Sequence, residues 1–158
     1  MDSRMKNPAL TVPGAMEALQ ALGKAIAKGG VSRTTLELVN LRASQINGCA
    51  VCLDMHSRAL KKLGEKDERI FSLAAWREAP YYSDGERAAL ALTEAATRID
   101  DRADPVPDAI WEEARRHYEE AELASIVLAI GTINLWNRLN AATRQISGEW
   151  TGQVYEGG

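Results

Sequence analysis

Residues 37–56 read ELVNLRASQINGCAVCLDMH, and this stretch holds both cysteines and one of the 2 histidines of the chain. The Asn47-Gly48 pair in its middle is typical of a turn, because both residues tolerate a positive φ. We expect one helix to end there and the next to fold back, so that positions equidistant from the turn face each other. Counting about ten residues to either side of position 47 then places Glu37 opposite His56 and its neighbours.

The second helix of this hairpin is expected to run from about Cys49 to Leu63, with Gly64 as its stop signal. At 100° per residue, Cys49, Cys52 and His56 fall within an arc of roughly 60°, so they point to one side. A Cys-x-x-Cys pair can cycle between dithiol and disulfide, because the short spacing holds the sulfurs near bonding distance. The positive end of the helix dipole favours a thiolate at this position.

A carboxylate beside an imidazole and a thiol forms a proton relay, since the acid orients the base and the base deprotonates the thiol. Each residue also has a simpler interpretation. Thr34 and Glu37 fit a capping box, and a pair of buried cysteines can be inert packing. Glu37, Cys49, Cys52 and His56 could also ligate zinc, although structural zinc usually gathers separated ligand pairs and this sequence has no second cluster.

The pattern Glu37-x(11)-Cys49-x(2)-Cys52-x(3)-His56 resembles the AhpD-like alkylhydroperoxidases of the carboxymuconolactone decarboxylase superfamily. Segments 76–77, 83–94 and 134–139 are also similar to family segments, and the resemblance covers roughly residues 10–147. It implies a single AhpD-like helical domain with peroxidase activity, in which these four residues are catalytic. It further implies that Cys52 attacks the peroxide and that Cys49 is the more exposed, resolving thiol, although the sequence alone leaves that order open.

The same resemblance implies a hydroperoxide as substrate and a dihydrolipoyl or thioredoxin-like dithiol as reductant, in a homo-oligomer, commonly a trimer or hexamer. No bound cofactor is implied, because the sulfurs hold the electrons. One departure is that Ala50 and Val51 stand where better-studied members often place histidine or tyrosine, which fits a slower peroxidase or a different substrate. Three other functions stay open: a protein disulfide oxidoreductase, a lactone decarboxylase (which needs no cysteine pair) and a non-enzymatic helical module.

Composition places the chain among ordinary globular proteins: 158 residues, 46% hydrophobic and 26% charged. A net charge of −3 without a basic stripe argues against nucleic acid as a partner. No apolar run is long enough to span a membrane, and the polar N-terminus lacks a secretion signal, so we expect a cytoplasmic protein. We divide the chain into an N-terminal arm (1–11), a helical domain (12–147) and a Gly-rich tail (148–158).

Apolar residues recur at spacings of three and four along most of the domain, and no alternation indicates a strand. This predicts an all-α fold with about seven helices, including one over roughly residues 67–79 and one over residues 86–99 with the cap signature Ser83-Asp84-Gly85-Glu86. The last helix, from about Glu120 to Gln145, is the most apolar and is expected at the centre of the core. Asn134 and Asn137 share one face of it and are expected to form a buried structural network. Glu94 is expected to be exposed, or a partner of the site by resemblance.

Overall fold

The computed structural model describes residues 2–99 and 102–148, and every regular element within these ranges is helical. The prediction of an all-α fold is confirmed, with eight α-helices and one 3-10 helix in the described ranges instead of about seven helices. In chain order the elements are α1 (Pro8–Thr11), α2 (Ala15–Ala27), α3 (Arg33–Asn47), α4 (Ala50–Lys62), α5 (Asp67–Phe71), η1 (Leu73–Ala75), α6 (Asp84–Thr97), α7 (Asp108–His117) and α8 (Glu120–Thr143).

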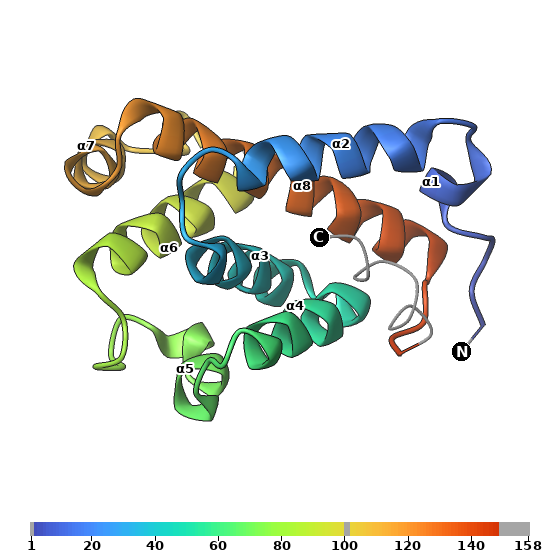
Figure 1. Ribbon diagram of the computed structural model, residues 1–158, viewed down its shortest axis with the longest axis horizontal. Helices are drawn as coiled ribbons and strands as arrows, with labels where there is room; N and C mark the ends of the chain where they lie inside the picture. Colours follow the sequence, from blue (N-terminus) through green and yellow to red (C-terminus); the bar gives the residue numbers. More distant parts are fainter. Residues whose placement is uncertain (1, 100–101, 149–158) are drawn as a thin grey trace.

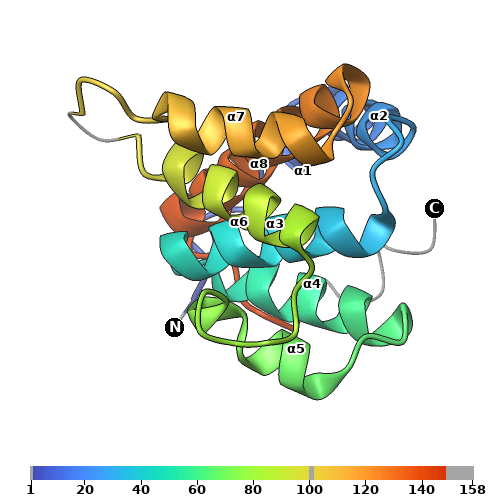
Figure 2. The same ribbon diagram turned by 90° about the vertical axis from the view of Figure 1, so that its left-hand side faces the viewer.

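Helix α3 lies at the centre of the fold. It packs against α4, α6 and α8. Figures 1 and 2 show α3 between the layer of α2 and α8 on one side and α4 and α5 on the other. Leu36 and Val39 join one apolar cluster, whereas Leu38 and Leu41 join another on the opposite side. Because α3 is enclosed by neighbours, the polar side chains that it buries must find partners inside the protein. These are Thr35, Glu37, Arg42 and Ser44.

The turn between α3 and α4 has the conformation that Asn-Gly predicts. Gly48 lies in the left-handed region at φ 65°, where a side chain would be strained. The backbone N–H groups of Gly48 and Cys49 both donate to the carbonyl oxygen of Ser44. Cys49 is already the N-cap of α4, so the chain reverses within two residues. Helices α3 and α4 therefore pack as the predicted antiparallel hairpin.

Helix α8 is central, as predicted, because Ile126, Ile130 and Ile133 are all nearly inaccessible. Helix α2 lies along it, as Figure 1 shows. At Gly29, just after α2, a Cβ atom would lie 2.5 Å from the Cβ of Ser125 on α8. The Ser125 hydroxyl uses this close approach to donate to the carbonyl oxygen of Ile26 at 2.7 Å. The absence of a side chain at Gly29 therefore sets the distance between α2 and α8.

The N-terminal segment is tied to the end of α8. The backbone N–H of Arg4 donates to the carbonyl oxygen of Thr143 at 2.8 Å, and Asn7 is buried. Thr11 ends the short helix α1 instead of capping the next helix, since α2 begins after Gly14 in a left-handed conformation. The part of residues 1–11 that is described therefore has defined contacts with the helical domain. Residues 149–158, most of the predicted tail, lie outside the described residues.

The expected helix over residues 67–79 is divided into α5 and η1. The Ser72 hydroxyl donates back to the carbonyl oxygen of Glu68 at 2.5 Å, where α5 ends. Further along, the Arg87 guanidinium donates to the carbonyl oxygens of Trp76 and Ala79. Trp76 and Ala79 fall in the last turn of the expected helix, where carbonyls have no partner within the helix, and Arg87 from α6 satisfies them instead. Within the described ranges, no helix combines the length and apolar character that are needed to cross a bilayer.

Candidate active site

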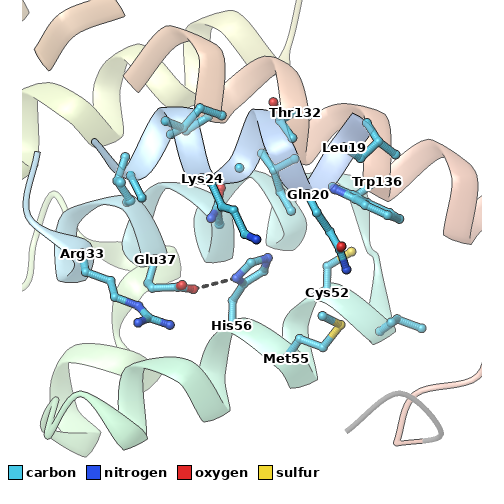
Figure 3. Close-up of a pocket in the computed structure, with 18 of the residues that line it drawn as sticks. Leu19, Gln20, Lys24, Arg33, Glu37, Cys52, Met55, His56, Thr132 and Trp136 are labelled. Atoms are coloured by element: carbon cyan, nitrogen blue, oxygen red, sulfur yellow. Dashed lines mark hydrogen bonds and ion pairs between the residues drawn. The ribbon is translucent and has the colours of Figure 1, made fainter. Parts of the chain in front are cut away.

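The α3–α4 hairpin brings together the carboxylate and the imidazole that the sequence places apart. Glu37 Oε2 and His56 Nδ1 lie 2.7 Å apart, and both residues are buried. Glu37 takes no part in capping α3, because Ser32 is the N-cap and accepts the backbone N–H of Thr35. The capping-box interpretation of Glu37 is therefore wrong. Its carboxylate instead fixes the orientation of the His56 ring (Figure 3).

The two cysteines are free thiols at the start of α4. The Cys49 sulfur caps the helix and accepts the backbone N–H of Cys52 at 3.3 Å. Both residues are 3% exposed, so the expectation that Cys49 is the more exposed thiol is wrong. As the N-cap, Cys49 keeps its sulfur against the first turn of α4. Side chains of α8 pack over Cys49 at this position and bury it.

The two thiols shift each other's pKa in opposite directions. A hydrogen bond from the Cys52 thiol, opposed by burial and supported by the Cys52 backbone N–H, lowers the pKa of Cys49 to about 6. That same hydrogen bond, together with burial, raises the pKa of Cys52. These two shifts favour the thiolate form of Cys49 and the protonated form of Cys52. The helix N-terminus provides the amide that makes this distribution favourable.

Asn140 of α8 completes the environment of the sulfurs. Its side-chain amide donates to Cys52 Sγ at 3.2 Å and lies 3.7 Å from Cys49 Sγ. Its orientation is fixed through Asn7, whose Oδ1 accepts the backbone N–H of Ala9 at 2.9 Å. Asn7 Nδ2 must then donate to Asn140 Oδ1, at 3.0 Å, which leaves the Asn140 NH₂ group for the sulfurs.

Sequence reasoning missed Asn7 and Asn140. A signal for Asn140 existed, because it continues the three-residue spacing of Asn134 and Asn137 along α8. The earlier two do form the expected buried network: Asn47 at the hairpin turn donates to Asn134 Oδ1 at 3.0 Å and to Asn137 Oδ1 at 2.8 Å. Along one face of α8, the Asn134 and Asn137 amides therefore bind Asn47 at the hairpin turn, and the Asn140 amide contacts the cysteine sulfurs. Asn7 gave no comparable signal, because its partners lie at the far end of the chain.

A cavity of about 710 Å³ opens beside these residues. Glu37, Cys52, His56 and Asn140 line it, whereas Cys49 is not among the described residues of its wall. In Figure 3, Cys52 and His56 project from α4 into the space beneath α2. A molecule in the cavity could therefore meet the Cys52 sulfur and the His56 ring together. Apart from the ring and the carboxylate, the wall is mostly apolar, which keeps water from competing for the hydrogen bonds of the site.

Glu94 lies in a separate buried cluster and not in the cavity wall. It accepts from Arg42 at 2.7 Å, from the Trp76 indole at 3.0 Å and from Arg77 at 2.6 Å, with Arg98 at 3.3 Å. Burial would raise the pKa of Glu94, but these donors outweigh it and lower the pKa to about 2. The expectation that Glu94 is an exposed helix residue is wrong. Its carboxylate is a permanently charged structural group.

The four residues of the predicted site are not arranged as a metal centre. Within residues 2–99 and 102–148, no group of three or more His, Cys, Asp and Glu side chains converges as metal ligands do. Glu37 is instead hydrogen-bonded to His56, and the Cys49 sulfur is engaged by the start of α4. The geometry is that of an acid–base pair next to a dithiol.

Comparison with known proteins gives the family. Residues 13–95 match the model of the carboxymuconolactone decarboxylase family. The chain is 42% identical to the uncharacterized protein YdfG of Bacillus subtilis over 130 residues, which cover 82% of this chain and 87% of YdfG. Alkyl hydroperoxide reductase AhpD of a Bradyrhizobium species is 50% identical, but over only 40 residues, which cover 25% of this chain and 22% of that protein.

Solved structures agree with this result. A protein of unknown function from Agrobacterium tumefaciens, proposed to be an antioxidant defence protein AhpD, superimposes with a TM-score of 0.85 at 36% identity, covering 92% of this chain and 98% of that chain. The debrominase Bmp8 has a TM-score of 0.77 at 21% identity, covering 87% of this chain and 73% of its own, and this likeness shows the fold alone. Together with the geometry of the cysteine site, these matches establish that the chain belongs to the carboxymuconolactone decarboxylase family as an AhpD-like member.

Proposed function

We propose that this protein is a thiol-dependent peroxidase that reduces organic hydroperoxides through a Cys49–Cys52 dithiol/disulfide cycle. The observation that carries the proposal is the position of the Cys52 sulfur, which lines a cavity beside the Glu37–His56 pair and has a second thiol within its own helical turn. A lactone decarboxylase would have no use for the second thiol. The AhpD-named relatives match this chain over short segments, and they support the proposal without establishing the activity.

Catalysis begins when the shared proton moves from Cys52 to Cys49, which delivers the negative charge to the sulfur that lines the cavity. The Cys52 thiolate attacks the terminal oxygen of the hydroperoxide, so an S–O bond forms and the O–O bond breaks. His56 holds the proton that the dithiol gave up when it became a thiolate, and the leaving alkoxide takes this proton and departs as the alcohol. Glu37 supports this transfer, because its carboxylate stabilises the imidazolium that donates the proton.

The Cys49 thiol then attacks the sulfenic acid on Cys52. An S–S bond forms, and the hydroxyl group leaves with the Cys49 proton as water. In sum, one hydroperoxide and two thiols give one alcohol, one water and one disulfide. An external dithiol returns two electrons and two protons to reset the site. Asn140 supports both steps by donating to whichever sulfur is charged.

The reductant we propose is a dihydrolipoyl group and not a thioredoxin-like protein. Both cysteine residues are only 3% exposed, so a protein surface cannot reach their sulfurs without opening the helices. A dithiol at the end of a flexible arm can enter the cavity that leads to Cys52. The same burial argues against the alternative of a general protein disulfide oxidoreductase, which must bring its sulfurs to a partner's surface.

The test is stopped-flow oxidation of the reduced protein by several organic hydroperoxides, with mass detection of the intramolecular disulfide. Cys52→Ser should abolish peroxide consumption, whereas Cys49→Ser should react once and leave a sulfenic acid that a dimedone-type reagent traps. Trapping on Cys49 in the Cys52→Ser variant would reverse the order of attack. If wild-type thiols stay reduced with every hydroperoxide, the peroxidase proposal is wrong.

We also propose that the protein acts as a homo-oligomer, such as a trimer or hexamer. Apolar side chains remain on the outer face of α8, where Val127, Leu128 and Leu135 are 42%, 48% and 39% exposed. Trp76 cannot contribute to such an interface, since it is buried beside Glu94. Light scattering of wild type and Leu128→Glu would test this, because a charge on the outer face should shift an oligomer towards the monomer.

A further inference from the structure

The cavity is far larger than hydrogen peroxide requires. Its volume is about 710 Å³, whereas a water molecule, which is close to peroxide in size, occupies about 30 Å³ of the liquid. Pockets of roughly 300–1,000 Å³ are typical of sites for organic ligands. Three helices besides α3 supply its apolar wall, with Leu19 from α2, Met55 from α4 and Trp136 from α8 as examples. The shape and lining therefore fit an extended apolar molecule.

Two cationic side chains stand at one end of this apolar wall. Lys24 from α2 and Arg33 from α3 both line the cavity, and both are exposed. Within the described part of the chain, neither is within ion-pair distance of a carboxylate. In Figure 3 the Lys24 side chain extends from α2 towards His56, and Arg33 lies beside Glu37. Glu37 is the one acidic residue among the described residues of the wall, and its Oε2 is engaged by His56.

The helical hairpin fixes how far this positive end lies from the reactive sulfur. Arg33 precedes Glu37 by four residues on α3, and Cys52 precedes His56 by four residues on α4. Because α3 and α4 are antiparallel and Glu37 pairs with His56, Arg33 and Cys52 lie on opposite sides of that pair. Each is about 6 Å away along the helix axes, since four residues rise by that length. Arg33 and Cys52 are therefore separated by about 12 Å along the helix axes, with the Glu37–His56 pair between them and Lys24 above that pair (Figure 3).

We infer that the cavity binds organic hydroperoxides that carry a carboxylate at the far end of an apolar chain, as in a fatty-acid hydroperoxide. Lys24 and Arg33 pair with the carboxylate, the chain lies along the walls from α2, α4 and α8, and the peroxide group reaches Cys52. This inference rests on the proposed peroxidase function and adds a preference among its substrates. The two cations are specificity-determining residues and take no part in the transfer of electrons.

The kinetic test compares ω-hydroperoxydodecanoate with its methyl ester, which has the same chain without the charge. Wild type should have a kcat/KM for the acid about ten-fold above that for the ester, since two partly solvated ion pairs contribute modestly. The double variant Lys24→Gln/Arg33→Gln should lose this preference, so that its kcat/KM values for the acid and the ester become equal. The control is Lys28→Gln/Lys62→Gln, which removes the same charge from exposed lysines that do not line the cavity.

A binding test separates this inference from the peroxidase proposal. Calorimetry with ω-hydroxydodecanoate, the unreactive alcohol product, should give a Kd about ten-fold tighter in wild type and the control than in Lys24→Gln/Arg33→Gln. If no hydroperoxide oxidises the cysteines but this difference in Kd is found, the peroxidase proposal fails and the anionic ligand class stands. Equal binding in all three proteins, or equal rates with acid and ester in wild type, would overturn the inference.

Discussion

Two buried glutamates divide this molecule into a structural region and a chemical one. Glu37 and Glu94 are 7% and 6% exposed, so burial alone does not distinguish them. Three arginines and an indole surround Glu94, and they hold its pKa at about 2 against the opposing effect of burial. Glu37 accepts from one ring nitrogen of His56 and lines a cavity. The two carboxylates differ in the number of hydrogen-bond donors that surround them and in whether a ligand can reach them.

This difference explains why only one of them can take part in proton transfer. A carboxylate that is saturated by permanent cations cannot respond to a change of charge nearby. A carboxylate that is paired with an imidazole can, because the imidazole gains and loses a proton in the working pH range. The Glu94 cluster joins α3, η1 and α6, and the Glu37 pair joins α3 and α4. Central helix α3 thus serves stability through Arg42 and chemistry through Glu37.

The largest expected effect is on stability, in Glu94→Gln. Removing one charge leaves the buried Arg42 without its anion, and breaking such a pair costs about 3–5 kcal/mol of the free energy of unfolding. The pKa of Glu94 is lowered from 4.5 to about 2, so its stabilisation is present above pH 4.5 and is lost as the pH falls towards 2. Urea unfolding from pH 7 to pH 2.5 should show the two proteins converging in acid. A constant difference in unfolding free energy at all pH values would contradict this account.

Glu37→Gln should lower the rate of peroxide reduction strongly and stability only slightly, which is the opposite of the effects expected for Glu94→Gln. The amide keeps the shape of the side chain but cannot stabilise an imidazolium, so peroxide reduction should slow roughly 100-fold. The loss of unfolding free energy should be smaller than in Glu94→Gln, because the partner of Glu37 is an imidazole and not a permanent cation such as Arg42. Stopped-flow rates and urea unfolding on both variants give the comparison. If Glu94→Gln lowers the rate per folded molecule as much as Glu37→Gln does, the division into two regions is wrong.

A smaller effect is expected from Asn140→Leu, which removes the donor to the sulfurs without changing the size of the side chain much. The rate of thiol alkylation in wild type should rise as the pH increases through about 6, the lowered pKa of Cys49. Losing a donor to the thiolate disfavours the charged form, so the midpoint should move upward, by about one pH unit. Iodoacetamide kinetics from pH 4 to pH 9 measure this midpoint. A midpoint that does not move would show that Asn140 is only packing.

The smallest effect is expected at Asn7, which fixes the orientation of the Asn140 side-chain amide. Asn7→Ser keeps an oxygen for the Ala9 N–H but loses the donor that fixes Asn140, so the midpoint should move upward by a few tenths of a unit. Gln145→Ala is the matched control, because Gln145 holds the same segment through the carbonyl oxygen of Met5 and does not contact a sulfur. An equal shift in the control would mean that any loosening of the segment acts on the thiols.

Local patterns predicted the elements well where a local hydrogen bond decides the structure. The Ser83–Glu86 capping box at the start of α6 is present, with both reciprocal hydrogen bonds. The hairpin at Asn47-Gly48 followed from the need for a positive φ at Gly48. At the start of α3, however, Ser32 is the cap instead of Thr34, since several hydroxyl residues in a row make the pattern ambiguous. The carbonyls of Trp76 and Ala79 are satisfied by Arg87 of a later helix, a contact that no local pattern reveals.

The sequence by itself determined the all-helical class, the antiparallel α3–α4 hairpin and the meeting of Glu37 with His56, because helical rise and one tight turn fix these distances. Only the tertiary structure decided that both cysteines are buried, that Asn7 and Asn140 orient a donor towards them, and that Glu94 is neutralised by arginines. The physical reason is the separation in sequence between the residues that interact. Turns and caps join residues within one or two helical turns, whereas burial and the Asn7–Asn140 contact depend on how helices distant in sequence pack against each other.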